Sequence, residues 1–452
     1  MRGPLHPADA AASTLLTDLY ELTMAAAYLA DGNHAPATFE LWVRRLGGRR
    51  SFLVAAGLED ALRYLEGLRF EGEALAYLHS LGRFDPGFLD YLGGLRFTGD
   101  VWAMPEGTIA FAGEPLLRVT APIIEAQLAE TFLLNAVGFH TLIASQAARV
   151  TLAAQGRPWV EFGARRAHGT DAALGAARCA YLGGAAATSL VLAGREFDIP
   201  VTGTMAHSYV LSHPSEREAF LAFARACPAD PVLLIDTFDT PAGARSAAEA
   251  ARELAAEGIS VSGVRLDSGD LGSLAVEVRR ILDAAGFPGI RILASGGLDE
   301  RGLAALVAAG APIDGFGIGT RLVTGGEDPS LDAVYKLVEA AGEPRLKTST
   351  GKETLPGVKQ VLRTETAGRI VEDTIALDGE KGVTGWPLLR QVMGGGRRLD
   401  PPETLEAARE RCRAGLGLLP EALRSLEAAQ DAPVRLSAGL QELAKKLRAG
   451  RE

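Results

Sequence analysis

Between residues 159 and 318, short apolar segments alternate with alanine-rich segments of helical character, and this alternation restricts the possible folds more than any other feature of the chain. The apolar segments begin about every 25 to 40 residues, a spacing typical of parallel βαβ units. A chain built from such units forms a barrel or a doubly wound sheet. The strands that we expect are 159–162, 199–205, 232–235, 260–266, 290–294 and 315–318.

The segments outside this repeat have a different character. Several have the apolar spacing of helices, while the stretch from residue 95 to residue 120 contains short β-like runs split by glycine and proline. A strand is also expected at 39–43 and another at 333–339. The helices that we expect before the repeat are 13–29, 57–68, 73–81 and 125–154, and those within it are 245–257, 271–285 and 300–309.

The predicted fold class is therefore α/β, with a parallel (β/α) barrel-like domain, an additional mixed α+β domain and a helical C-terminal tail. We expect the N-terminal helical and β-rich domain to cover residues 1–150 and the barrel-like domain to cover residues 151–345. The remainder, residues 346–452, is expected to pack onto the body. It begins with a patch rich in lysine, threonine and glycine and ends in a segment rich in arginine and glutamate.

Composition excludes several classes of function. The chain has 452 residues, of which 47% are hydrophobic and 23% charged, so it can bury a large core. Its formal charge of −10 argues against a general surface for nucleic acid or anionic membranes. The three cysteines form no CxxC pair and no zinc spacing, and neither a signal core nor a membrane span is visible. We expect a reduced, cytoplasmic protein.

Polar residues follow the carboxyl end of each expected strand, the edge at which α/β barrels collect their active sites. An apolar run ends in Thr204 and His207, where a side chain is expected to emerge into the site. An isolated histidine is more often structural than reactive, and no Ser/His/Asp or metal-ligand spacing surrounds this one; its position at a strand end makes the two interpretations equal. The other residues in such positions are Glu161, Arg165, Asp236, Arg265, Asp267, Ser295, Gly296, Gly297, Gly319 and Thr320.

Two glycine-rich turns come after the last two expected strands. Ser295, Gly296 and Gly297 form the first turn, and Gly319 with Thr320 the second. Glycines let the backbone approach an anion, and a hydroxyl adds a further donor. Each turn alone is as well explained as a tight turn with a helix cap, but as consecutive turns of one repeat they favour a phosphate site.

Arg265 and Asp267 are two residues apart on one strand end, so their side chains point to the same side. The arginine can grip an anionic substrate, and the carboxylate can accept ribose hydroxyls or hold magnesium through water, as can Asp236. An internal salt bridge is the alternative. In the loop after 159–162, Phe162 can stack on a flat ring and Arg165 can neutralise its carboxylate, although a solvated basic turn explains them equally well.

Taken together, these stretches resemble the nicotinate phosphoribosyltransferase family. The resemblance runs in unbroken order from about residue 14 to about residue 440. Its motifs are Leu16-Thr17-Asp18-Leu19-Tyr20-Glu21-Leu22-Thr23-Met24, Glu161-Phe162-Gly163 with Arg165-Arg166, Gly203-Thr204-Met205-Ala206-His207-Ser208, Arg265-Leu266-Asp267-Ser268-Gly269-Asp270-Leu271, Ala294-Ser295-Gly296-Gly297-Leu298-Asp299-Glu300, Gly315-Phe316-Gly317-Ile318-Gly319-Thr320 and Pro433-Val434-Arg435-Leu436-Ser437.

The resemblance implies a type II phosphoribosyltransferase fold and transfer of a phosphoribosyl group from phosphoribosyl pyrophosphate to nicotinate, coupled to ATP hydrolysis and assisted by Mg²⁺. It implies that His207 is transiently phosphorylated and that Tyr20 stacks on the pyridine ring. Thr204 and Arg265 are expected to help hold nicotinate, and Thr320, with Gly319 and the Ser295 turn, the 5-phosphate. Tyr20 is expected to come from a neighbouring subunit, so the sites would be shared in a homodimer.

The nearest alternative is nicotinamide phosphoribosyltransferase, whose substrate is the neutral amide. There the family places an aspartate in the loop that aligns with Ser189 here. A carboxylate about 4 Å from the carboxylate of nicotinate would cost on the order of 4 kcal/mol at an effective dielectric of 20, so serine favours the acid. Nicotinate enzymes often have asparagine where this chain has Leu190.

Other classes remain as alternatives. Quinolinate phosphoribosyltransferase needs a basic pocket for a second carboxylate and gives no reason for a phosphohistidine. An aldolase should place a Schiff-base lysine on a barrel strand, and the expected strands contain none. A non-catalytic nucleotide sensor is disfavoured by the presence of Tyr20, His207 and Asp267.

Overall fold

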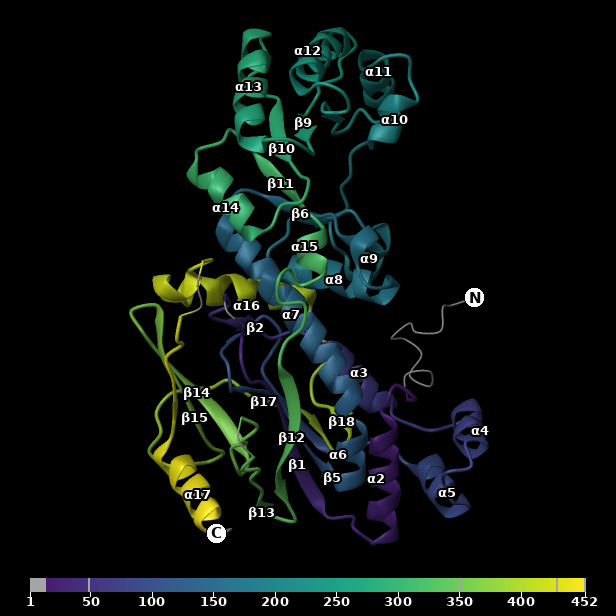
Figure 1. The fold of residues 1–452 in the computed structure, drawn as a ribbon, viewed down its shortest axis with the longest axis vertical. Helices are drawn as coiled ribbons and strands as arrows, with labels where there is room; N and C mark the ends of the chain where they lie inside the picture. Colours follow the sequence, from purple (N-terminus) through teal and green to yellow (C-terminus); the bar gives the residue numbers. More distant parts are fainter. Residues whose placement is uncertain (1–13, 48, 350, 428–429, 451–452) are drawn as a thin grey trace. The chain divides into compact units, whose positions relative to one another are not determined.

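The computed structural model describes residues 14–47, 49–349, 351–427 and 430–450. The chain divides into two compact units: unit 1 comprises residues 1–145 and 328–452, and unit 2 comprises residues 146–327. The ribbon in Figure 1 shows the elements of each unit. The C-terminal residues therefore do not form a separate part: together with the N-terminal residues they build unit 1.

Unit 1 is organised around β1 (Pro36–Val43), which pairs antiparallel with β12 on one side and with β5 on the other. Seven of its eight residues are buried. The Phe39 ring stacks on that of Tyr335 across the β1–β12 pair, with centroids 4.9 Å apart. The seven-stranded sheet has the order β13 (Glu343–Pro344), β12 (Ala333–Ala340), β1, β5 (Pro115–Pro122), β3 (Asp100–Ala103), β17 (Arg390–Gly394) and β18 (Arg397–Arg398).

Two smaller sheets complete unit 1. A hairpin of β14 (Lys359–Thr366) and β15 (Arg369–Leu377) was not expected from the sequence, and the tail strand β19 (Val434–Leu436) joins it in parallel. β16 (Trp386–Pro387) completes that sheet, and β2 (Leu53–Val54) pairs with β4 (Ile109–Ala110). An Arg363–Asp373 ion pair is buried between β14 and β15.

The helices of unit 1 lie largely where the apolar spacing predicted them. The expected helix at 13–29 begins later, at Leu19, because Asp18 has extended backbone geometry and precedes the first turn. The expected 125–154 helix is two helices that meet at Ala129. The helices described in unit 1 are α2 (Leu19–Ala30), α3 (Leu58–Gly67), α4 (Gly72–Ser80), α5 (Pro86–Gly94), α6 (Ile123–Leu128), α7 (Glu130–Ala154, which crosses the unit boundary), α16 (Leu405–Leu418), η2 (Glu421–Arg424) and α17 (Ala438–Ala449).

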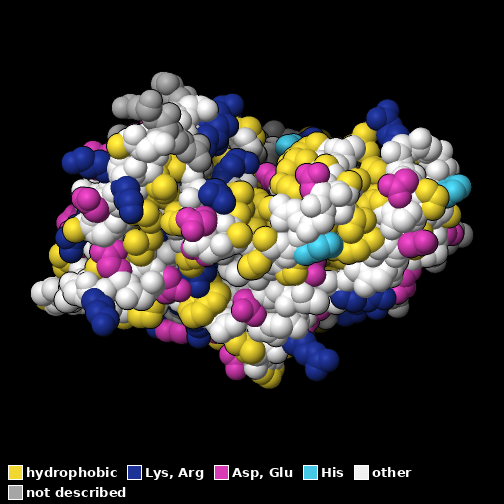
Figure 2. Space-filling model, turned by 90° about the horizontal axis from the view of Figure 1, so that it is seen from below, with side chains coloured by type: hydrophobic (Ala, Val, Ile, Leu, Met, Phe, Trp, Pro, Cys, Tyr) yellow, Lys and Arg dark blue, Asp and Glu magenta, His cyan; other side chains and the backbone are white. Residues whose placement is uncertain are grey.

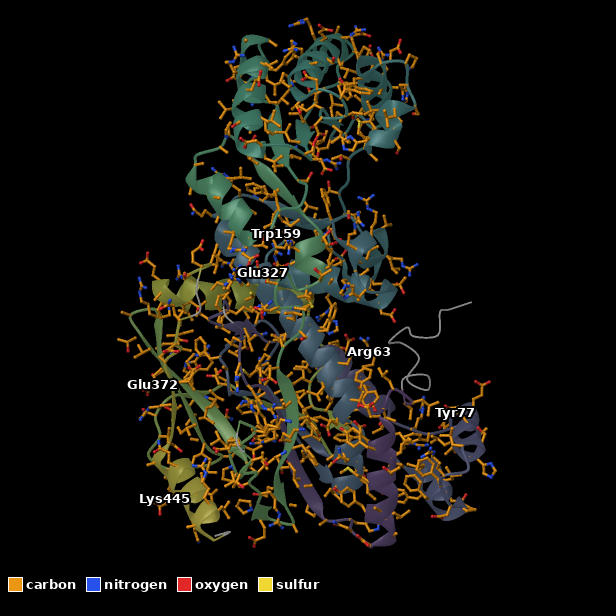
Figure 3. The ribbon with its side chains drawn as sticks, in the orientation of Figure 1. Arg63, Tyr77, Trp159, Glu327, Glu372 and Lys445 are labelled. Carbon is orange, nitrogen blue, oxygen red and sulfur yellow. The ribbon has the colours of Figure 1, made fainter. Side chains whose placement is uncertain are left out.

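The face drawn in Figure 2 carries basic and acidic side chains interspersed with hydrophobic ones. Figure 3 shows how the side chains are distributed, with Tyr77 on α4 and Trp159 at the start of β6. Tyr77 is 55% exposed, whereas Trp159 is buried and donates from Nε1 to Thr151 Oγ1 at 3.0 Å.

Unit 2 contains a six-stranded sheet in which all neighbouring strands pair parallel, as the repeat predicted. Its order is β7 (Ala187–Thr188), β6 (Trp159–Glu161), β11 (Gly315–Ile318), β10 (Arg291–Ala294), β9 (Gly263–Leu266) and β8 (Val232–Leu234). Among the described residues β7 and β8 end this row, so the sheet is a half-barrel. The expected barrel-like α/β fold is confirmed in this open form.

Seven α-helices and one 3-10 turn of the described residues connect these strands, and an eighth helix follows the last of them. Asp239, Asp270 and Asp299 each cap the helix that follows β8, β9 or β10 by accepting backbone N–H groups of the first turn. The turn and the helices described in unit 2 are η1 (Ala164–Arg166), α8 (Thr170–Leu182), α9 (Val191–Phe197), α10 (His207–Leu211), α11 (Glu216–Ala226), α12 (Thr240–Ala256), α13 (Leu271–Ala284), α14 (Glu300–Ala308) and α15 (Thr320–Val323).

The strand expected at 199–205 is wrong. Only Val201 makes a bridge, to Thr188 of β7, flanked by hydrogen bonds from Thr188 N to Pro200 O and from Thr202 N to Thr188 O, both 3.0 Å. Pro200 lacks an N–H, and the chain at Gly203 is exposed. The segment is an extended arm that leads to α10.

Candidate active site

His207 is the first residue of α10, and its ring lies between the loops that follow β8 and β9. Its Nδ1 is 3.1 Å from Thr237 Oγ1. Its Nε2 is 3.9 Å from Asp267 Oδ2, and the imidazole is 40% exposed. One ring nitrogen therefore contacts a hydroxyl and the other faces a carboxylate, while the ring stays accessible to a small molecule.

Asp236 links the ends of β8 and β9. Its Oδ2 accepts the backbone N–H of Asp267 at 2.8 Å and the hydroxyl of Ser268 at 2.6 Å. Its Oδ1 is buried and has no hydrogen-bond partner in the part of the chain that the structure describes. A buried carboxylate oxygen without a partner is costly unless a cation or a donor reaches it.

Asp236 consequently fits the expected magnesium better than Asp267 does. The Oδ1 of Asp267 accepts a hydrogen bond from Ser295, and its Oδ2 faces His207. No cluster of three or more His, Cys, Asp or Glu side chains suited to a metal occurs among the described residues. Mg²⁺ commonly uses one or two carboxylates and completes its shell with waters and substrate phosphates, which agrees with such a sparse protein contribution.

Arg265 and Thr204, both expected to contact nicotinate, are in contact with each other. Arg265 Nη1 donates to Thr204 Oγ1 at 2.6 Å, and Arg265 Nε is buried without a partner among the described atoms. Burial lowers the pKa of this guanidinium, the charges of Asp267 and Asp236 oppose that shift, and Arg165 adds to it. Arg165 thus adds a second positive charge to the surroundings of Arg265, which favours an anionic ligand in this region.

The turn after β10 is held against the end of β9. The Ser295 hydroxyl donates to Asp267 Oδ1, and its backbone N–H donates to Leu266 O at 2.8 Å. Gly296 has φ +94°, and a Cβ there would lie 1.9 Å from the carbonyl oxygen of Asp267. Gly297 has φ +68° but faces open space. The first glycine is required for close approach and the second for backbone conformation only.

The turn after β11 contains Gly319 and Thr320. Thr320 is exposed and begins the short helix α15. Gly319 lies close to the backbone of Phe162, since a Cβ there would be 3.2 Å from its carbonyl oxygen. Both glycine-rich turns are therefore at the carboxyl edge of the half-barrel, on neighbouring strands, as the phosphate hypothesis requires.

The Phe162 loop and the Ser189 loop follow neighbouring strands β6 and β7. The ring of Phe162 lies over Gly317, where a Cβ would be 2.5 Å from two ring carbons. Arg165 is exposed on η1, and Ser189 is exposed directly after β7. The predicted base-binding residues of unit 2 thus come from consecutive strand ends.

Tyr20 belongs to unit 1, whereas the other predicted site residues belong to unit 2. It is 47% exposed on α2. Burial raises the pKa of its hydroxyl, helped by the charges of Glu130 and Glu21. Glu21 accepts hydrogen bonds from the Thr131 hydroxyl at 2.6 Å and the Thr131 backbone N–H at 3.1 Å. The hydroxyl of Tyr20 therefore stays protonated, and nearly half of the residue is exposed to solvent.

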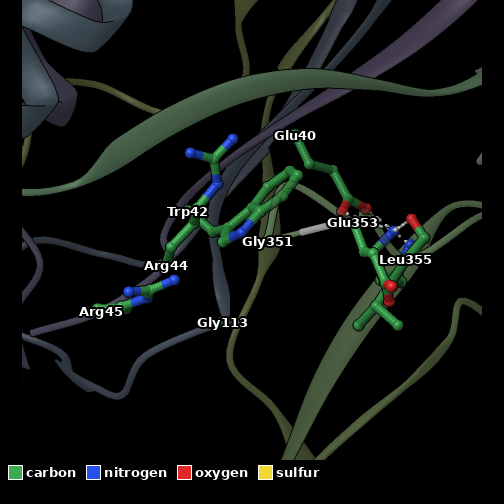
Figure 4. A pocket seen from close by; sticks show the side chains of 9 residues that line it. Glu40, Trp42, Arg44, Arg45, Gly113, Gly351, Glu353 and Leu355 are labelled. Carbon is green, nitrogen blue, oxygen red and sulfur yellow. Dashed lines mark hydrogen bonds and ion pairs between the residues drawn. The ribbon is translucent and has the colours of Figure 1, made fainter. Parts of the chain in front are cut away.

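Two features were missed by reasoning from the sequence. Thr237, which contacts His207, directly follows Asp236 after β8, so its position after a strand could have identified it as a candidate site residue. The second feature is a pocket of about 330 Å³ in unit 1 (Figure 4), where Lys359 Nζ contacts Glu40 Oε2 at 2.9 Å. The other residues that line this pocket are Trp42, Arg44, Arg45, Gly113, Gly351, Glu353 and Leu355.

Structural comparison identifies the class of protein. The crystal structure of human nicotinic acid phosphoribosyltransferase matches with a TM-score of 0.84 at 32% identity, over 95% of this chain and 99% of that chain. The nicotinate-nucleotide pyrophosphorylase of Pyrococcus furiosus matches with a TM-score of 0.75 at 25% identity, over 91% and 97% of the two chains. Fold and site together define a type II phosphoribosyltransferase.

Sequence comparison gives the family. Residues 15–138 match the model of the nicotinate phosphoribosyltransferase N-terminal domain. The nicotinate phosphoribosyltransferase pncB2 of Mycobacterium tuberculosis is 51% identical over 414 residues, covering 91% of this chain and 89% of that protein. The human enzyme of the same name is 34% identical over 528 residues, covering 98% of each. The chain belongs to the nicotinate phosphoribosyltransferase family.

Within the described residues, no helix is both long and apolar enough to span a membrane.

Proposed function

We propose that this chain forms nicotinate mononucleotide and pyrophosphate from nicotinate and phosphoribosyl pyrophosphate, a step of NAD biosynthesis. The observation that supports this most directly is the convergence of the Arg265–Thr204 pair and the Asp267–Ser295 pair at one edge of the half-barrel. The first pair offers a cation and a hydroxyl to an aromatic acid. The second pair joins a carboxylate to the glycine-rich turn that would take the 5-phosphate.

The reaction needs positioning and charge stabilisation more than proton transfer. Positive charge develops at the anomeric carbon as pyrophosphate leaves, and the ring nitrogen of nicotinate attacks with a lone pair that it already has. Asp267, held by Ser295 and by the Asp236–backbone contact, would stabilise the ribose side of that charge. Mg²⁺ on Asp236 would neutralise charge on the pyrophosphate.

We further propose that ATP phosphorylates His207. A ring nitrogen would attack the γ-phosphorus, ADP would leave, and water would later cleave the phosphorus–nitrogen bond. Support comes from the 40% exposure of the imidazole and from its contacts with Thr237 and Asp267, which orient the ring. The nitrogen of nicotinate needs no general base, so the histidine is free for energy coupling.

Preference for nicotinate over nicotinamide rests on charge. Ser189 contributes no negative charge where the resemblance places an aspartate in the amide-specific relatives. Arg265 and Arg165 add positive charge close by. Tyr20 would supply the stacking partner of the pyridine ring from a second subunit, so the proposed active form is a homodimer with shared sites.

One product assay tests the reaction and its specificity together. The protein is incubated with phosphoribosyl pyrophosphate and Mg²⁺, and nicotinate, nicotinamide or quinolinate is offered separately, with and without ATP. Nicotinate should give the mononucleotide fastest, and ATP should increase its yield. Preferential use of either other base would overturn the assignment.

Variants then test the individual residues. [γ-³²P]ATP should leave acid-labile label on the wild type and none on His207→Asn, and equal labelling would remove His207 from its proposed role. Arg265→Ala should weaken nicotinate binding. Mixing inactive Tyr20→Ala and His207→Ala subunits should restore activity in the heterodimer if the sites are shared, and no recovery in verified heterodimers contradicts sharing.

A further inference from the structure

Glu161 is a buried carboxylate at the end of β6 that no step of the proposed reaction uses. It is 1% exposed. Its Oε1 accepts the backbone N–H of Gly163, and its Oε2 accepts the hydroxyl of Thr188 at 2.7 Å. Its backbone carbonyl oxygen accepts the N–H of Ser189 at 3.0 Å. One residue thus ties together the loop after its own strand and the loop after the neighbouring strand.

Both of these loops carry expected nicotinate contacts. Phe162 and Arg165 lie on the first, and Ser189 follows Thr188 on the second. The Gly163 contact fixes the start of the η1 turn that holds Arg165. The Thr188 hydroxyl also accepts the N–H of Leu190 at 3.0 Å, so the carboxylate and this hydroxyl together determine the path of the second loop.

The cost of burying this carboxylate is a second observation. Burial raises the pKa of Glu161, and the hydrogen bonds from Thr188, Gly163 and Ala164 oppose that rise. An uncharged residue would avoid this cost if filling space were the only requirement. Space next to the carboxylate is also restricted, because a Cβ on Gly163 would lie 3.0 Å from Oε1 and 2.2 Å from Val323.

We infer that Glu161 is a positioning residue for the nicotinate site: it sets the geometry of the Phe162–Arg165 turn relative to the Ser189 loop. The inference rests on the proposed function, because it assigns these loops to the base. Glu161 itself touches neither substrate nor reacting atoms. Its effect should therefore be seen in nicotinate binding before it is seen in the use of phosphoribosyl pyrophosphate.

The test compares Glu161→Ala with Glu161→Gln. The glutamine amide can accept from Gly163 and donate to the Thr188 hydroxyl, so it keeps both links without charge. In Glu161→Ala, we expect KM for nicotinate to rise about 100-fold, since a displacement of about 1 Å in a site has effects of that size. KM for phosphoribosyl pyrophosphate should change less than about threefold, and Glu161→Gln should restore nicotinate KM to within about fivefold of wild type.

Thr188→Val is the matched control, because it removes only one of the two links and should give an intermediate nicotinate KM. Equal losses in all kinetic constants, or no rescue by glutamine, would overturn the inference. Hydrogen exchange of the Gly163 amide provides a readout that needs no activity: it should be slow in the wild type and in Glu161→Gln and fast in Glu161→Ala. A wild type that uses no base would refute the proposed function, whereas unchanged exchange in Glu161→Ala would refute the positioning role.

Discussion

The glycine-rich turn after β10 offers a sharp test, because its two adjacent glycines both have positive φ but only one of them is crowded by another atom. Both have positive φ, +94° at Gly296 and +68° at Gly297, so alanine at either position adopts a conformation that costs about 1–2 kcal/mol. Only at Gly296 would the new Cβ meet another atom, the carbonyl oxygen of Asp267, at 1.9 Å. Gly297→Ala therefore measures backbone strain without the collision.

The size of the collision gives the expected loss. An ordinary carbon–oxygen contact is about 3.3 Å, so the turn and the strand end must separate by more than about 1 Å in Gly296→Ala. That movement pulls Ser295 away from the Asp267 carboxylate, to which its hydroxyl donates. Misplacement of about 1 Å can cost about 100-fold in rate, which corresponds to about 2.7 kcal/mol of transition-state stabilisation.

The assay is initial-rate kinetics at saturating nicotinate with varied phosphoribosyl pyrophosphate, with thermal melting to establish that each variant is folded. We expect kcat/KM to fall about 100-fold or more in Gly296→Ala and no more than about tenfold in Gly297→Ala. Equal losses in the two folded variants would show that the contact with Asp267 does not organise the site. A fully active Gly296→Ala enzyme would refute the reasoning altogether.

Three further outcomes are expected. Gly317→Ala should displace the Phe162 ring, because that ring lies 2.5 Å from the position of the new Cβ. Nicotinate KM should rise by a factor that corresponds to about 1–3 kcal/mol, and unchanged nicotinate binding in a calorimetric titration would contradict this. Burial, with the charge of Asp373, holds the pKa of Glu114 well above its usual range, so the stability that its neutral form provides is fully present below the ordinary carboxyl pKa and is lost as pH rises from there through the folded-state pKa. In urea unfolding, Glu114→Gln should therefore lose less stability than wild type as pH rises above the ordinary range of a glutamate, and parallel losses would exclude this origin. A thiol reagent should label only Cys227 in the native chain, since the other two cysteines are buried, and labelling of a second thiol before unfolding would show that a buried cysteine is accessible.

The parallel sheet of unit 2 could be predicted because its signal is local. Buried parallel strands are short apolar runs, and the helices between them have their own apolar spacing. The exception is the segment around Val201, whose apolar composition resembles a strand although Pro200 and Gly203 limit its pairing to one bridge. β7 was missed because two residues are too few to give a pattern.

The hairpin of β14 and β15 escaped prediction for a different reason. Its buried positions include Lys359, Arg363, Asp373 and Thr374, which interrupt the apolar alternation that marks a strand. Arg363 can be buried because Asp373, opposite it on the paired strand, accepts hydrogen bonds from its guanidinium. This ion pair cannot be recognised until the register of the two strands is known. A polar pair of this kind is a property of the fold and not of either segment.

The same limit applies to the site. Strand-end positions predicted that Arg265, Asp267 and Ser295 gather at one edge, whereas Thr204 reaches Arg265 from the extended arm and not from the end of a strand. Sequence reasoning could not predict that the Ser295 hydroxyl would donate to the Asp267 carboxylate. Nor could it predict that Asp236 would accept the backbone N–H of Asp267. Those contacts depend on how far neighbouring strands are offset along each other, which tertiary packing decides.

The pairing of β1 also has a consequence for synthesis of the chain on the ribosome. Unit 2 is one continuous stretch and can complete its sheet as it emerges, whereas β1 must wait for β12 until all of unit 2 has been made. During that interval one side of β1 is an unpaired strand edge, a template for association with other chains. Translation that stops after residue 327 would leave that edge open permanently, and the product would aggregate through unit 1 despite an intact unit 2.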